Sequence, residues 1–249
     1  MMQIAKERIK LELLIHDLKV PLAVIETGLR ALLDRKGSYG PLSKQQERVL
    51  ERTLRNAKIT RTLVNDALEL GRSAQGVTTK NECTLAEFIE QSFVEIFDLL
   101  DHPMAERIRG CVNLKRLQEI LLEKGIRLEM EDDLWTQKLC LDEDKVRQIM
   151  RNLLHNALKF RRQVVELKVE RGADHLLIAL TDDGEGIPAT FHQKIFDCYF
   201  QLDMQGEQCV RGHGLGLAGV MVLVEDMGGM MSLQSDTDQG TTFLVKLPC

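Results

Sequence analysis

The chain has 249 residues, of which 44% are hydrophobic and 29% are charged. This composition supplies enough apolar side chains for one large core or two smaller ones, and it excludes intrinsic disorder over most of the chain. The longest uncharged apolar stretch, residues 214–224, is too short to span a bilayer, and residues 1–10 lack the apolar region of a signal peptide. We therefore expect a soluble, cytoplasmic protein that makes no membrane contact.

The formal net charge of −5 argues against nucleic-acid binding, but the charge is unevenly distributed. Residues 1–80 contain 15 Lys and Arg against 9 Asp and Glu, so this part could attract an acidic protein partner. A solvated helical surface would show the same charge. The six cysteines lie at irregular spacings without a C-x-x-C motif, which predicts reduced thiols with no assigned role.

The N-terminal part of the chain has the pattern of two amphipathic helices. Leucine and isoleucine recur at helical spacing over residues 4–33, and residues 37–41 then break the pattern. Ser43 followed by Gln46 predicts a capping box that opens a second helix reaching Leu70. Residues 1–73 are therefore predicted to form an antiparallel helical hairpin. Because one hairpin has little internal core, we expect two copies to pair in a four-helix bundle, which makes the protein a homodimer.

The remaining residues predict a mixed domain, so the fold class is α+β. Residues 74–84 are polar and predict a linker, and the domain follows over residues 85–249. Helical spacing and strand alternation alternate along it. We expect helices at 85–100, 104–122, 144–160 and 215–227, and strands near 126 and at 164–170, 176–181, 230–235 and 242–247.

Polar residues interrupt these apolar patterns at a few places. His16 lies off the apolar stripe of the first helix, near Pro21, which removes one helical hydrogen bond. Asn152, Asn156 and Lys159 share one flank of the helix at 144–160, where an amide oxygen could bind Mg²⁺ and an ammonium could neutralise phosphate. Taken singly, these residues are better explained as a surface histidine and a polar helix flank.

Two glycine-containing segments have a similar double interpretation. Asp182 ends an apolar strand just before a glycine turn, where its carboxylate could accept a hydrogen bond from the amine of a base, although a structural turn is the alternative. Gly212, Gly214 and Gly216 open the helix at 215–227, where backbone N–H groups could meet phosphate. A dinucleotide-binding unit is excluded, because no strand precedes these glycines and too few residues follow them.

The ordered set of motifs resembles the sensor histidine kinases of two-component signalling. The motifs are HDLKVPL (16–22), NLLHNALKF (152–160), DDGEGIP (182–188), IFDCYF (195–200), GHGLGL (212–217) and GTTF (240–243). The resemblance covers nearly the whole chain. It implies a dimerisation and histidine-phosphotransfer hairpin followed by an α/β-sandwich ATP-binding domain of the type shared with gyrase and the Hsp90 chaperone.

The resemblance also implies a role for each matching residue. His16 would be the phosphoacceptor, Asp17 its orienting general base, and a response-regulator receiver domain the partner that takes the phosphoryl group. Asn156 would hold Mg²⁺, Asn152 and Lys159 would contact the phosphates of ATP, and Asp182 would bind the adenine amine. The glycines would shape the nucleotide pocket (Gly184 and Gly186) and hold a mobile lid at 201–211 (Gly212, Gly214 and Gly216).

Two other functional classes compete with this interpretation. A non-enzymatic scaffold of the same fold is disfavoured by the intact His16, Asn156 and Asp182. A gyrase-type ATPase is disfavoured because an amide, Asn152, stands where those enzymes carry the glutamate that activates water.

Two features depart from the family pattern. Residues 101–125 form an extra helical segment that could pack on the domain or bind a partner, and Val20 replaces the polar residue that many relatives use to dephosphorylate the receiver.

Overall fold

The computed structural model describes residues 2–34, 39–73, 81–109, 111, 113–197 and 216–249. The chain divides into two compact units, Met1–Gln75 and Gly76–Cys249. Within the described residues, no helix combines the length and the apolar composition that crossing a membrane requires.

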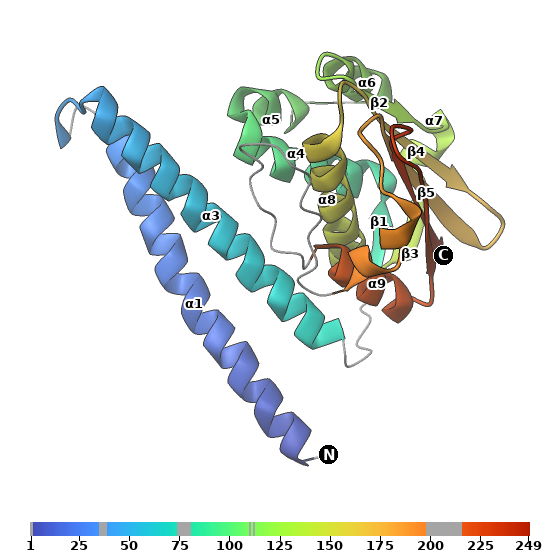
Figure 1. The fold of residues 1–249 in the computed structure, drawn as a ribbon, viewed down its shortest axis with the longest axis horizontal. Coiled ribbons are helices and arrows are strands. Elements are labelled where there is room, and N and C mark those ends of the chain that lie inside the picture. Colours follow the sequence, from blue (N-terminus) through green and yellow to red (C-terminus); the bar gives the residue numbers. More distant parts are fainter. Residues whose placement is uncertain (1, 35–38, 74–80, 110, 112, 198–215) are drawn as a thin grey trace. The chain divides into compact units, whose positions relative to one another are not determined.

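The first unit is a helical hairpin made of α1 (Met2–Asp34) and α3 (Lys44–Ser73), which lie side by side (Figure 1). The Ser43 N–H donates to Gln46 Oε1 over 2.9 Å, and the Gln46 N–H donates to Ser43 Oγ over 3.2 Å. This reciprocal pair satisfies two N–H groups that the helix start leaves free. The capping box expected from the sequence is therefore confirmed, and α1 runs without interruption through Pro21.

The second unit combines a five-stranded sheet with helices on one of its faces (Figure 1). Its sheet has the order β2-β4-β5-β7-β6, in which β2 and β4 are parallel and the other neighbours are antiparallel. A separate antiparallel pair joins β1 to β3. The strands are β1 (Asn81–Thr84), β2 (Ile126–Glu129), β3 (Lys138–Leu141), β4 (Val165–Arg171), β5 (His175–Asp182), β6 (Met230–Ser235) and β7 (Thr241–Pro248).

The helices bury the alternate residues of these strands. In β5, every second side chain is buried, as a strand with one covered face requires. Helix α8 packs on β5 and contacts both α4 and α9. The helices are α4 (Leu85–Leu100), α5 (His102–Arg109), α6 (Leu114–Leu122), α7 (Asp132–Trp135), α8 (Glu143–Phe160) and α9 (Gly216–Asp226), with short 3₁₀ turns η1 (Ala189–Phe191) and η2 (Lys194–Phe196).

Two sequence expectations are corrected by the structure. The last four residues of the predicted linker, 81–84, form β1, because Cys83 is buried and the segment pairs with β3. The single helix expected over 104–122 is two helices, since the Asn113 side chain accepts a hydrogen bond from the Arg116 N–H and so starts α6 afresh.

The extra segment at 101–125 contributes to the core of the second unit. Leu114, Leu117 and Leu121 are buried in the main apolar cluster, and Leu122 is 60% exposed. Of the two roles considered for this segment, packing on its own domain is the one the structure supports.

Candidate functional site

Helix α8 carries the two amides and the ammonium singled out in the sequence. The Asp142 side chain caps its start by accepting from the Lys145 N–H over 3.2 Å. Asn152, Asn156 and Lys159 are half-buried on this helix. Asn152 Nδ2 donates to the carbonyl oxygen of Gly216 over 3.3 Å, so this amide joins α8 to the first residue of α9.

The end of α8 presents an aromatic ring beside the ammonium group. Helical spacing places Phe160 on the apolar stripe, yet this residue is 50% exposed. Lys159 Nζ lies 4.6 Å from the centre of that ring, within the range of a cation–π contact. Periodicity alone predicts a core residue at this position, so the exposure of Phe160 could not be expected from the sequence.

Asp182 ends β5 with a buried carboxyl group that is 5% exposed. Its Oδ1 accepts a hydrogen bond from the Gly184 N–H over 2.9 Å. Burial raises the pKa of Asp182 and the neighbouring Asp183 charge raises it further, while N–H donors of Gly184 and Thr241 act in the opposite direction. A Cβ on Gly184 would lie 2.5 Å from the carbonyl oxygen of Phe160, so only glycine lets this turn lie against the end of α8.

Asp183 fixes the same turn from its other side. Its carboxylate accepts backbone hydrogen bonds from Arg162 (2.8 Å), Gln163 (3.0 Å) and Val164 (3.0 Å), the residues that follow α8. Desolvation raises the pKa of Asp183, but these donors favour the charged form and hold the pKa below its usual value. The tandem Asp-Asp-Gly was the only sequence signal for this role, since the donors lie far away in the sequence.

Gly186 is required by packing against the turn between β6 and β7. Its φ of +72° lies in the left-handed region, and a Cβ there would collide with the carbonyl group of Asp236. The Asp238 N–H donates to the Glu185 carbonyl over 2.6 Å, and the Ile187 N–H donates to Ser235 Oγ over 2.8 Å. Gly186 therefore lets the segment after Asp182 pack against the turn between β6 and β7.

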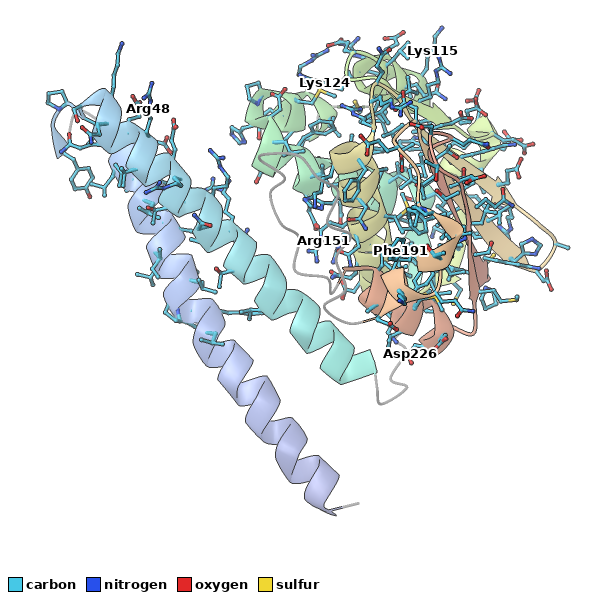
Figure 2. All side chains as sticks on the ribbon, in the orientation of Figure 1. Arg48, Lys115, Lys124, Arg151, Phe191 and Asp226 are labelled. Atoms are coloured by element: carbon cyan, nitrogen blue, oxygen red, sulfur yellow. The ribbon has the colours of Figure 1, made fainter. Side chains whose placement is uncertain are left out.

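A buried ion pair holds the far end of α9. Lys145 is buried on α8, and its Nζ lies 3.2 Å from Oδ2 of Asp226, which Figure 2 labels at the end of α9. Because Asn152 contacts the start of α9 and Lys145 its end, the two helices run antiparallel. These two contacts hold α9 against α8 near both of its ends.

The remaining predicted site residues lie elsewhere. His16 and Asp17 belong to α1 in the first unit, and their side chains lie outside the described residues. Gly212, Gly214 and the proposed lid at 201–211 also lie outside them. The structure thus brings Asn152 to Gly216, and Asp182 and Gly184 to the end of α8.

The donor set around α8 limits how a metal ion could bind. Among the described residues there is no group of three His, Cys, Asp or Glu side chains able to hold a metal ion. Asn156 offers one neutral amide oxygen. Such a donor fits Mg²⁺ only when water and phosphate oxygens supply the other ligands, which is how Mg²⁺ commonly binds beside nucleotides.

Comparison with known proteins matches both units. Residues 13–76 match the His Kinase A (phospho-acceptor) domain, and residues 141–249 match the histidine kinase-, DNA gyrase B-, and HSP90-like ATPases. The chain is 30% identical over 235 residues to the circadian input-output histidine kinase CikA of Synechococcus elongatus, covering 94% of this chain and 29% of the relative. It is 28% identical to the aerobic respiration control sensor protein ArcB of Escherichia coli, covering 93% of this chain and 27% of that relative. The chain therefore spans less than a third of the length of these relatives.

Solved structures share the fold. The full-length ShkA structure in complex with AMPPNP matches with a TM-score of 0.65 and 23% identity, over 96% of this chain and 45% of that one. The histidine kinase AdeS of Acinetobacter baumannii matches with a TM-score of 0.56 and 16% identity, over 94% of this chain and 97% of that one. The α+β fold class expected from the sequence is confirmed. Both domains of the kinase are present in order, and the chain belongs to the sensor histidine kinases.

Proposed function

We propose that this chain is an ATP-dependent protein histidine kinase core, which phosphorylates His16 and passes the phosphoryl group to an aspartate of a response-regulator receiver domain. The observation that carries the proposal is the position of α8 in a domain matched to an ATPase family. Its amide Asn152 contacts the start of α9, and its end lies against the turn that buries Asp182.

Each site residue has a role in nucleotide binding under this proposal. The buried Asp182 carboxyl accepts a hydrogen bond from the adenine amine, and Gly184 lets the turn approach α8. Asn152 and Lys159 contact the phosphates. Gly212, Gly214 and Gly216 supply backbone N–H groups near the start of α9. The exposed ring of Phe160 offers a flat apolar surface on which a base can stack.

A magnesium ion would be held by Asn156 together with phosphate and water oxygens. When bound, Mg²⁺ offsets negative charge on the phosphates. The residues of the chain do the rest of the positioning, because Asn152 and Asn156 lie one helical turn apart on the same flank of α8.

The transfer itself uses His16 and Asp17. One imidazole nitrogen attacks the γ-phosphorus in line, a P–N bond forms, the bond to the bridging oxygen breaks, and ADP leaves. Asp17 accepts a hydrogen bond from the other ring nitrogen and takes the proton that the phosphorylated ring loses. An aspartate of the receiver then attacks the phosphohistidine, which restores His16.

ATP hydrolysis of the gyrase type is the less suitable reaction. An amide cannot remove a proton from water. Asn152 Nδ2 also donates to the carbonyl oxygen of Gly216, so this amide anchors α9 in addition to its proposed contact with phosphate. Because an amide stands here, transfer to His16 is favoured.

The hairpin supplies the features that a homodimer and an acidic partner require. Leu18, Ile25 and Val49 are exposed on α1 and α3, although the apolar stripe would bury such residues in a bundle. The excess of Lys and Arg over residues 1–80 suits the acidic active site of a receiver domain.

Incubation with γ-labelled ATP and Mg²⁺ tests the proposal directly. The parent chain should acquire a label that survives base and is lost in acid, as expected for phosphohistidine. His16→Ala should abolish the label and retain ATP binding, because acceptor and nucleotide residues belong to different units. His102→Ala, which removes an exposed histidine of the second unit, should label as the parent does. An acid-stable label on the His16→Ala chain would refute the assignment.

The adenine role of Asp182 is measured separately by competition between ATP and GTP for a fluorescent nucleotide. Asp182→Ala should weaken ATP binding about tenfold to a hundredfold, since hydrogen bonds to charged groups contribute about 1.5–3 kcal/mol. Asp133→Ala, which removes an exposed carboxylate of the same unit, is the control. Unchanged preference for ATP over GTP in the Asp182→Ala chain would contradict this role.

A further inference from the structure

A row of three polar residues crosses the sheet at the end of its helix-covered face. Asp182 of β5 pairs with Thr241 of β7, and Thr241 pairs in turn with Ser235 of β6. Directly opposite residues of antiparallel strands point to the same face, and Asp182 and Thr241 continue the buried alternation of their strands. Asp182 and Thr241 are 5% and 6% exposed, so this end of the row is not fully closed to solvent.

The hydroxyl group of Ser235 makes three hydrogen bonds, and their chemistry fixes where each proton lies. The Ile187 N–H donates to Ser235 Oγ over 2.8 Å, and Ser235 Oγ donates to the carbonyl oxygen of Gly240 over 2.7 Å. A carbonyl oxygen can only accept, so Gly240 takes the single proton of the serine hydroxyl. Thr241 Oγ1 lies 3.0 Å from Ser235 Oγ, which has no second proton to offer. The Thr241 hydroxyl must therefore donate to Ser235.

This proton arrangement makes Thr241 Oγ1 an acceptor toward any ligand, because its own proton is used by Ser235. Asp182, which accepts the adenine amine under the proposed function, lies directly across from Thr241. Two neighbouring acceptors match an exocyclic amine, which carries two protons. An oxo group at the same position of a purine carries no proton, so it would face lone pairs and leave these buried acceptors unpaired.

We propose that Ser235 is a positioning residue for nucleotide selection, which keeps the Thr241 hydroxyl an acceptor so that a 6-aminopurine is bound in preference to a 6-oxopurine. This inference rests on the adenine role of Asp182 in the proposed function. Ser235 touches no ligand and acts through Thr241, which separates it from Asp182 in the sheet. Without the serine hydroxyl, the Thr241 hydroxyl is free to rotate and donate to an oxo group, and the selection weakens.

Competition of ATP and inosine triphosphate (ITP) for a fluorescent nucleotide measures this selection. ITP carries an oxo group in place of the adenine amine and a proton on the neighbouring ring nitrogen. Ser235→Ala should lower the ratio of ATP affinity to ITP affinity several-fold, the effect expected of about one hydrogen bond. Ser235→Thr, which keeps a hydroxyl group, should retain the parent ratio. Ser232→Ala, at an exposed position of the same strand, is the control and should leave the ratio unchanged.

Thr241→Val separates selection from support of the turn, because valine has the shape of threonine without its hydroxyl. This variant alone should lower the ratio, and adding Ser235→Ala to it should change the ratio no further.

Three results would overturn the proposal and leave the adenine site standing. They are an unchanged ratio in Thr241→Val, a loss of ATP and ITP affinity by the same factor in Ser235→Ala, and an effect of Ser235→Ala that persists in the Thr241→Val chain. A parent chain that binds ATP and ITP equally, or neither of them, would remove the adenine role of Asp182 together with this inference.

Discussion

Asp182 and Asp183 are adjacent in sequence, but their carboxyl groups lie in opposite environments. Asp182 is buried at the end of β5, and desolvation raises its pKa. Asp183 accepts three backbone hydrogen bonds from the residues after α8, which outweigh desolvation and lower its pKa. Asp183 therefore holds the turn in place, whereas under the proposed function Asp182 accepts a hydrogen bond from the adenine amine.

These opposite shifts predict opposite effects of pH on stability. Asp183 stabilises the fold at pH values above its usual pKa of about 3.9, and this contribution is lost as pH falls through its lower folded pKa. Asp183→Asn should therefore lower the urea midpoint near pH 7, and the difference should shrink toward pH 3. Burial of Asp182 disfavours the ionised form of its carboxyl group. The folded state therefore loses stability as pH rises above about 3.9, where the same group ionises freely in the unfolded chain. Asp182→Asn should become more stable relative to the parent over that rise in pH. If the stability of both variants relative to the parent changed in the same direction with pH, the two pKa directions would be contradicted.

Val20 predicts weak phosphatase activity. It lies one turn after His16 on α1, and its side chain is 55% exposed. Valine can neither donate nor accept a hydrogen bond, so it cannot orient the water that removes phosphate from a receiver. We expect slow loss of label from a phosphorylated receiver in the presence of ADP, and a gain with Val20→Thr. Rapid loss with the parent chain, unchanged in Val20→Thr, would assign this role to another residue.

Among the elements, α6 offers a matched pair of leucines that measures how far the segment 101–125 belongs to the core. Leu117→Ala empties a fully buried position and should cost about 2–5 kcal/mol of unfolding free energy. Leu122→Ala changes an exposed position on the same helix and should stay within about 0.5 kcal/mol of the parent. Denaturant unfolding of the two variants gives the comparison, and equal losses would mean that α6 does not pack as described.

The elements with long periodic patterns were predictable, whereas the short strands β1 and β3 and the short helix α7 were not. The hairpin helices and α8, β4, β5, β6 and β7 follow from helical or alternating spacing. Strands β1 and β3 have four residues each, too few to show a period, and they form because they pair with each other although the paired residues lie 54 to 60 positions apart in the sequence. The sequence predicts α5 and α6 as one helix, because the break between them depends on the Asn113 cap that starts α6.

The site was predictable where a motif names a residue type and was not where a contact joins distant segments. Asn152, Asp182 and Gly184 were singled out from sequence, and the structure gives each a contact. The anchoring of Asp183 and of Asp226 depends on partners 19 to 21 and 81 residues away, respectively. No local pattern indicates such pairs.

For the whole molecule, the uneven charge predicts how salt affects the two reactions. The basic N-terminal part should attract an acidic receiver domain. Their association rate should therefore fall as ionic strength rises from about 0.05 to 0.3 M, because salt shortens the range of the electrostatic attraction. Phosphotransfer should slow several-fold. Autophosphorylation measured without the receiver is the control and should change less. Equal sensitivity of both reactions would remove the electrostatic part of the partner proposal.

The last strand in the sequence occupies the interior of the sheet. β7 lies between β5 and β6, so β6 has no neighbour in the sheet until residues 241–248 are present. A nascent chain that has been translated only to residue 240 exposes one edge of β5 and leaves Met230–Ser235 unpaired. On the ribosome, the α1–α3 hairpin can therefore form early from local contacts, whereas the second unit completes its sheet only after nearly all of it has been synthesised.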